Sequence, residues 1–173
     1  MNTKKILINS FKAGLDAVKP ENIIKSKLPS PPKGRTFVIG AGKAAASMAK
    51  AVETNWPKNA PLSGSVITRY KHSLKTRKIK IYESGHPMPD TAGMTAAKSF
   101  ISNINDLDSN DLLLCLISGG GSSLMTVPQD GLNMNDLRNV TKNLLNCGAE
   151  ISEINTVRKH LSKTHGGKIP LYT

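Results

Sequence analysis

Two short apolar segments of the chain run directly into glycine-rich loops, and each loop is followed by a segment of different periodicity. Residues 36–39 precede Gly40-Ala41-Gly42, and residues 112–117 precede three consecutive glycines. Between and after them, apolar strand-like segments alternate with helix-like ones, which favours an α/β fold built on a parallel sheet with flanking helices. Because such sheets bind ligands at the carboxyl ends of their strands, both glycine loops are expected at one edge.

The periodicity of the apolar residues predicts nine elements. Strands are expected at 36–39, 64–70, 78–83 and 112–117, and helices at 3–18, 43–52, 91–104, 134–146 and 152–162. The last strand is apolar on both faces, which is typical of a central parallel strand, and Cys115 within it is expected to be a buried, reduced thiol. Asp90 is expected to cap the helix that follows it.

The net charge of +12 over 173 residues raises the question of a nucleic-acid partner. The lysines are spread along the chain, the only dense cluster is 69–80, and aromatic residues make up 4%. Without a stacking, zinc or basic-zipper pattern, we expect no nucleic-acid partner. No segment approaches the length of a membrane span, and the apolar run 6–8 is too short for a signal peptide, so we expect a cytoplasmic protein without a membrane partner.

The first glycine loop has three ligand-binding interpretations, and close packing is the alternative to them. Gly40-Ala41-Gly42 followed by Lys43 fits the loose dinucleotide pattern G-x-G-x-x-A, but residues 68–71 lack the acidic ribose ligand, which disfavours NAD and leaves NADP. A Walker A loop is excluded because Ala44 follows the lysine. Lys43 could instead neutralise a transferring phosphoryl group, or the glycines could serve only close packing.

The second loop is denser in glycine, which costs backbone entropy on folding. Successive N–H groups and hydroxyls can wrap a phosphate as an anion-binding nest, although a flexible connector is the alternative. The candidate phosphate ligands of this loop are Ser118, Gly119, Gly120, Gly121, Ser122 and Ser123.

Two further segments carry polar groups that suit chemistry. His86 lies in the proline-rich segment 86–90 and is either an acid–base group or a packed residue. Asn155, Arg158 and Ser162 would form one polar stripe on a helix that faces an anion, with an exposed basic helix as the alternative. The cysteines have no metal-ligand spacing, and we expect no metal site built by the protein.

Taken together, four motifs in order identify a family. They are V-I-G-A-G-K-A-A at 38–45, G-H-P-M-P-D at 85–90, S-G-G-G-S-S-L at 118–124 and N-T-V-R-K-H-L-S at 155–162. This arrangement resembles the type-2 glycerate kinase family, also named hydroxypyruvate reductase, from about Phe11 to Gly167. The resemblance implies transfer of the γ-phosphoryl group of ATP to the 2-hydroxyl of D-glycerate with Mg²⁺.

The resemblance also implies roles for individual residues. Lys43 would be catalytic; Gly40, Gly42 and 118–123 would bind the nucleotide phosphates; His86, Asn155 and Arg158 would bind the substrate D-glycerate. Arg158 suits a carboxylate because its fork permits bidentate binding. The role of His86 stays open, and a homo-oligomer is possible.

The resemblance further implies a Rossmann-like first domain and a smaller second α/β domain. We expect an N-terminal helix and linker at 1–34, an incomplete Rossmann-like domain at 35–168 and an off-pattern tail at 169–173, in which Pro170 breaks an expected helix. A chain of this kind is expected to be inactive alone. The alternatives are an NADP-dependent hydroxypyruvate reductase and a basic, non-enzymatic binding protein.

Overall fold

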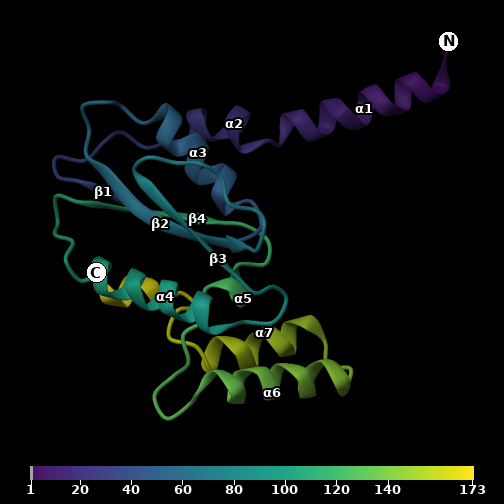
Figure 1. Cartoon of the computed structure of the whole chain (residues 1–173), viewed down its shortest axis with the longest axis vertical. Helices are drawn as coiled ribbons and strands as arrows, with labels where there is room; N and C mark the ends of the chain where they lie inside the picture. The colour runs from purple at the N-terminus through teal and green to yellow at the C-terminus, as the bar shows by residue number, and fades with distance from the viewer. Residues whose placement is uncertain (1) are drawn as a thin grey trace.

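Four parallel strands form the centre of the protein, whose computed structural model describes residues 2–173. The strands are β1 (Thr36–Ala41), β2 (Leu62–Arg69), β3 (Ile79–Ser84) and β4 (Leu112–Ile117). They lie in the order β3-β2-β1-β4, so the sheet is parallel throughout, as predicted (Figure 1). The α/β fold class is therefore confirmed.

Helices cover both faces of this sheet. The helical elements are α1 (Thr3–Ala17), α2 (Pro20–Ile23), η1 (Ile24–Lys27), α3 (Ala45–Asn55), α4 (Thr91–Ile104), α5 (Gly121–Leu124), α6 (Met134–Asn146), α7 (Ile151–His160) and η2 (Ile169–Tyr172). Helix α3 lies on one face of the sheet, α4 and α5 lie on the other, and the α6–α7 pair lies beyond α5 (Figure 1). None of these helices is long and apolar enough to cross a membrane.

The alternation of side chains along β1 divides the core into two layers. Val38 points to the α3 side, where it belongs to a cluster with Ala49 and Val52. Phe37 and Ile39 point to the opposite side, into a cluster built mainly on α4. Each layer buries apolar area, which is the main stabilising contribution to such a fold.

Strand β4 is an edge strand of the described sheet, because its ladder partner within residues 2–173 is β1 alone. Cys115 is exposed, and Ile117 is 54% exposed. The predictions of a central strand and of a buried thiol are therefore wrong for this structure. An apolar run indicates that both faces of a strand can be buried, but it does not determine how many strands lie beside it.

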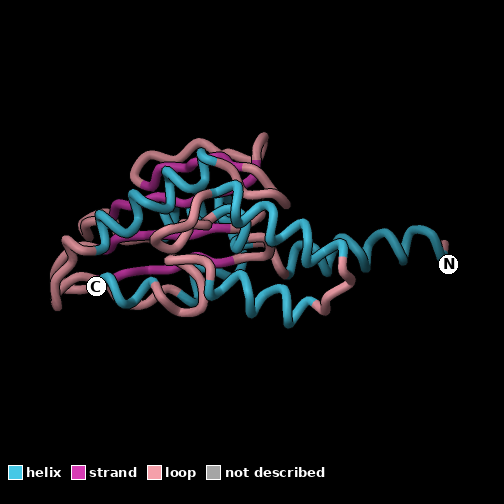
Figure 2. Tube along the Cα trace, turned by 90° about the horizontal axis from the view of Figure 1, so that it is seen from below, coloured by secondary structure: helices cyan, strands magenta, loops and turns pink. Residues whose placement is uncertain are grey.

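Helix α1 projects away from the rest of the molecule (Figures 1 and 2). It begins where the side chain of Asn2 caps Lys5, and none of its residues is buried. Its apolar stripe, which includes Leu7, Phe11 and Leu15, is exposed. The core begins with Ile24, which packs in the α3 cluster.

The segment after residue 168 packs on the sheet domain. It forms the short helix η2, with Pro170 in the first turn, where proline is tolerated. Ile169 and Tyr172 pack against the core cluster under α4. These contacts tie the end of the described chain to the same core as the strands.

Candidate anion-binding site at the carboxyl ends of the strands

The two glycine loops meet where β1 lies beside β4. After β1 the chain enters α3 on one face of the sheet, whereas β4 is reached from α4 on the other face. The strand order reverses here, and such a switch point leaves a crevice beyond the strand ends. The predicted position of both loops at one edge is thus confirmed.

Three hydrogen bonds tie the loops to each other. The N–H of Lys43 donates to the carbonyl oxygen of Gly119 over 2.9 Å, and the N–H of Ala44 donates to Ser118 Oγ over 3.0 Å. In return, the N–H of Ser118 donates to the carbonyl oxygen of Ala41 over 3.1 Å. The amides of the first loop that a dinucleotide pyrophosphate would need are therefore already engaged.

Gly40 and Gly42 permit this close approach. A Cβ atom on Gly40 would clash with the carbonyl oxygen of Leu116, and one on Gly42 would clash with Ser118. Gly42 also has a φ of +139°, which disfavours any other residue. In this structure the glycines of the first loop serve packing between β1 and β4, which is the alternative to the ligand-binding interpretations of the pattern.

The second loop keeps free donors. The N–H groups of Gly119, Gly120 and Ser122 make no hydrogen bond within residues 2–173. The Cε atom of Lys43 lies 3.8 Å from where a Cβ of Gly119 would be, so the lysine side chain extends over this loop. Free amides next to an exposed ammonium group form an arrangement that suits a phosphate.

His86 lies against the same loop. A Cβ atom on Gly120 would be 2.8 Å from Cε1 of the imidazole, and Nδ1 is 2.6 Å from Oγ of the buried Ser123. Burial, followed by the positive charges of Lys43, Arg69 and Arg158, lowers the pKa of His86 below its usual value. The imidazole is therefore neutral at neutral pH and is surrounded by cations.

Asp90 holds the segment that carries His86. Its carboxylate accepts four hydrogen bonds, from the N–H of Gly93 (2.9 Å), the N–H of Gly85 (2.8 Å), Oγ of Ser84 (3.0 Å) and the hydroxyl of Tyr70 (2.7 Å). Burial acts to raise the pKa of Asp90, but these hydrogen bonds together lower it below its ordinary value. The predicted cap of α4 is confirmed, and the same carboxylate also anchors the loop.

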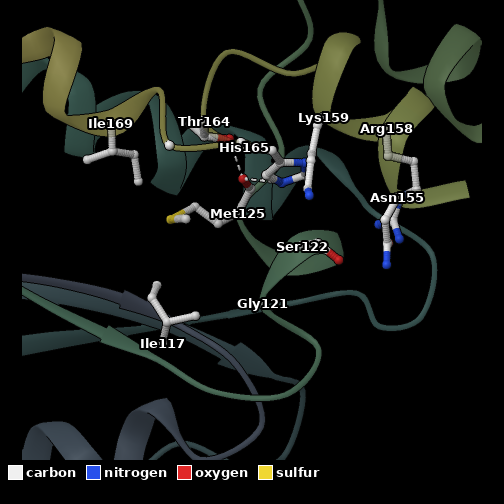
Figure 3. Close-up of a pocket in the computed structure, with 12 residues that line it drawn as sticks. Ile117, Gly121, Ser122, Met125, Asn155, Arg158, Lys159, Thr164, His165 and Ile169 are labelled. Atoms are coloured by element: carbon white, nitrogen blue, oxygen red, sulfur yellow. Dashed lines mark hydrogen bonds between the residues drawn. The ribbon is translucent and has the colours of Figure 1, made fainter. Parts of the chain in front are cut away.

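Arg158 lies in a cavity of about 430 Å³ beside the loops. It extends from α7 next to Asn155, and Ser122 lines the opposite side (Figure 3). Its guanidinium makes no ion pair or hydrogen bond within residues 2–173, and burial lowers the pKa of Arg158. A half-buried cation without a partner is costly, so this arginine is suited to receive an anionic ligand.

One residue of the predicted stripe points away from the cavity, and a histidine outside the stripe lines it. Ser162 is fully buried, and its hydroxyl pairs with Thr164 over 3.0 Å, so it does not face the cavity. His165 lines the cavity, and Nε2 donates to the carbonyl oxygen of Met125 over 3.2 Å (Figure 3). Burial, followed by the charge of Arg158, lowers the pKa of His165 to about 4.

Arg69 is a site residue that the sequence reasoning did not select. It is exposed at the carboxyl end of β2, and its charge acts on His86. The signal that could have found it is a cation at the end of the strand next to β1. Most of the basic cluster after it belongs to the connection 70–78, and Lys80 lies in β3. The carboxylate of Glu83 accepts hydrogen bonds from the N–H groups of His72 and Ser73 in this connection.

A metal ligand set is lacking in the part of the chain that the structure describes. Residues 2–173 contain no group of three or more histidine, cysteine or acidic side chains that could hold an ion. The residues present therefore do not fit a protein-held Mg²⁺, and the site is an array of cations and amide donors.

Fold and site together define a parallel α/β protein with a candidate anion-binding edge at its switch point. The family model described as domain of unknown function DUF4147 matches residues 6–172, and the chain belongs to this family. The predicted resemblance to the type-2 glycerate kinases is confirmed by the named relatives.

Three relatives and one solved structure give the measure of the similarity. A glycerate 2-kinase of Pyrococcus horikoshii is 42% identical over 92% of this chain and 36% of its own length. A D-glycerate 2-kinase of Thermotoga maritima is 40% identical over 95% of this chain and 40% of its own length. A provisionally named hydroxypyruvate reductase of Agrobacterium vitis is 43% identical over 98% of this chain and 38% of its own length. The crystal structure of a Thermotoga maritima glycerate kinase matches with a TM-score of 0.86 and 40% identity, over 95% of this chain and 40% of that one. The chain thus spans about two fifths of the length of these relatives.

Proposed function

We propose that the chain supplies the phosphate-binding and substrate-binding part of an ATP-dependent glycerate 2-kinase. The observation that carries the proposal is the convergence of Lys43, Arg69 and Arg158 around a loop with free amides, without an ion pair to any of the three within residues 2–173. Such an array suits two anionic ligands, a nucleotide and a carboxylate. A cytoplasmic location belongs to the same proposal.

The proposed chemistry follows from positioning and charge. Phosphoryl transfer requires little covalent chemistry from the protein, and most of the catalysis comes from placing the reactants and stabilising the charge. The free amides of Gly119, Gly120 and Ser122 would hold nucleotide phosphates. Lys43 would stabilise the migrating phosphoryl group, and Arg158 with Asn155 would hold the carboxylate of D-glycerate. Mg²⁺ would arrive with the nucleotide.

A reductase that uses NADP is the second candidate, and the name of the Agrobacterium relative favours it. The geometry of the first loop disfavours it, because the amides of Lys43 and Ala44 are bonded to the second loop where a pyrophosphate would lie. Binding of a nucleic acid is the third, and it rests only on the net charge.

One set of assays separates the three candidates. The purified chain is incubated with ATP, Mg²⁺ and D-glycerate, and 2-phosphoglycerate is measured; oxidation of NADPH by hydroxypyruvate is measured in parallel. Because a chain of this kind is expected to be inactive alone at an ordinary kinase rate, we expect only slow formation of phosphorylated product, and no NADPH oxidation. NADPH oxidation without product, or only salt-dependent DNA binding, would replace the kinase proposal.

A further inference from the structure

We infer that His86 takes the proton of the substrate hydroxyl during phosphoryl transfer, and that Ser123 sets the tautomer in which it can do so. The inference rests on the proposed kinase function and assigns a role to a side chain that the fold places against the phosphate loop. His86 is thus a catalytic residue, and Ser123 is a positioning residue that acts through it.

The tautomer follows from a count of protons. Ser123 Oγ is 2.6 Å from His86 Nδ1 and 3.1 Å from the carbonyl oxygen of Gly120. The carbonyl can only accept, and the hydroxyl has a single proton. Both hydrogen bonds exist together only when the hydroxyl donates to Gly120 and Nδ1–H donates to the hydroxyl. Nε2 is then unprotonated and free to accept.

The surroundings of His86 favour this state. Ser123 is buried, so water does not compete for its hydroxyl. The segment carrying His86 is held at both ends, by Asp90 as described and by Nε of Arg138 in α6, which donates to the carbonyl oxygen of Pro89 over 2.8 Å. The charged groups facing the ring, Lys43, Arg69 and Arg158, are all cations, which oppose protonation before the substrate arrives.

The step balances as a simple transfer. The O–H bond of the substrate breaks and an Nε2–H bond forms on His86, while the oxygen forms a bond to the γ-phosphorus and the bond to the ADP oxygen breaks. The imidazolium then releases its proton to water, so that the net products are ADP, the phosphate ester and H⁺. A neutral imidazole is suited to accept this proton, because the bound anionic nucleotide and substrate neutralise the cations around it.

The first test is the tautomer, which needs no turnover. In chain labelled with ¹⁵N-histidine, the spectrum of His86 is assigned by its loss in His86→Gln. At pH 7.5 we expect a protonated Nδ1 and an unprotonated Nε2, and we expect Ser123→Ala to lose this preference. A proton on Nε2 of His86 in the wild-type chain would overturn the inference.

The second test is the pH dependence of the reaction. We expect wild-type kcat/KM to fall on the acid side with an apparent pKa below 6.5, and His86→Gln to lose this limb together with about 10²-fold or more of kcat. Ser123→Ala should move the limb and lower kcat less. Equal rates and profiles in wild type and His86→Gln would overturn the role of His86 alone. Absence of both 2-phosphoglycerate formation and ATP binding in the wild type would instead overturn the kinase function, while the tautomer would still be readable.

Discussion

The backbone N–H of Lys43 donates a hydrogen bond of 2.9 Å to the carbonyl oxygen of Gly119. This bond joins the loop after β1 to the loop after β4, so the lysine that would stabilise a migrating phosphoryl group is positioned by the loop that would hold the other phosphates. The two glycine motifs are therefore one structural unit.

Lys43→Ala is expected to remove function without harming the fold. The side chain is exposed and makes no hydrogen bond or ion pair within residues 2–173, so the midpoint of thermal unfolding should stay within about 2 °C, the shift expected for a change of a few tenths of a kcal/mol. Affinity for ATP, measured by calorimetry, should fall about tenfold or more, since hydrogen bonds to charged groups contribute roughly 1.5–3 kcal/mol. Lys50→Ala, an exposed lysine on α3, is the control and should bind ATP like the wild type.

Gly42→Ala should destabilise the fold, because the new Cβ would clash with Ser118 at a φ of +139°. We expect a loss of about 2 kcal/mol or more in the free energy of unfolding by urea. Gly119→Ala is the matched control in the facing loop, where the nearest atom is 3.8 Å away. Equal stability of the two variants would contradict the packing role given to Gly42.

Arg158→Leu should weaken the binding of D-glycerate without lowering the stability of the fold. The guanidinium is half-buried and unpaired, so replacing it should leave the free energy of unfolding unchanged or raise it. Affinity for D-glycerate should fall about tenfold or more through loss of a charge-assisted contact. Lys142→Ala, an exposed cation on α6, should change neither quantity. A strongly destabilised Arg158→Leu would show that the arginine has a structural partner.

Stability should decrease in mild acid because of His165, whose pKa in the folded chain is lowered to about 4. Between pH 6.5 and about 4 the unfolded chain binds a proton at this residue and the folded chain does not, so stability is lost as the pH falls through this range. The loss between pH 7.5 and pH 5 should be about 2 kcal/mol in urea unfolding. His165→Gln keeps a donor for Met125 and should reduce this pH dependence.

Deletion of residues 2–17 should leave the sheet domain intact, since no residue of α1 is buried. The shortened chain is expected to unfold at the same urea midpoint as the full chain, with circular dichroism showing only the loss of one helix. A large fall of the midpoint would mean that the apolar stripe of α1 packs on the domain in solution.

Local signals predicted the elements well. The bounds of α4 and α6 agree with the helices predicted at 91–104 and 134–146, because apolar spacing and the cap at Asp90 are encoded within a few residues. The edge position of β4 was not predictable in this way, since the number of neighbours of a strand is a property of the whole sheet. The exposure of Cys115 follows from that edge position.

The sequence predicted which residues belong to the candidate site better than it predicted the contacts between them. Lys43, His86 and Arg158 follow from motifs, and the structure brings them around one loop. The amides of Lys43 and Ala44 are hydrogen-bonded to the second loop, and neither motif alone predicts this. The reason is that the bonds join distant parts of the chain; Ala44 and Ser118, for example, are 74 positions apart. Arg69 was missed because its role depends on the strand order.

The most direct test of the phosphate-binding site is a calorimetric titration of the chain with ATP and Mg²⁺, repeated with Lys43→Ala and with NADPH as competitor. We expect saturable binding of ATP that weakens about tenfold or more in the variant and is unaffected by NADPH. ATP binding of equal strength in wild type and Lys43→Ala, or displacement of ATP by NADPH, would contradict the proposed phosphate site.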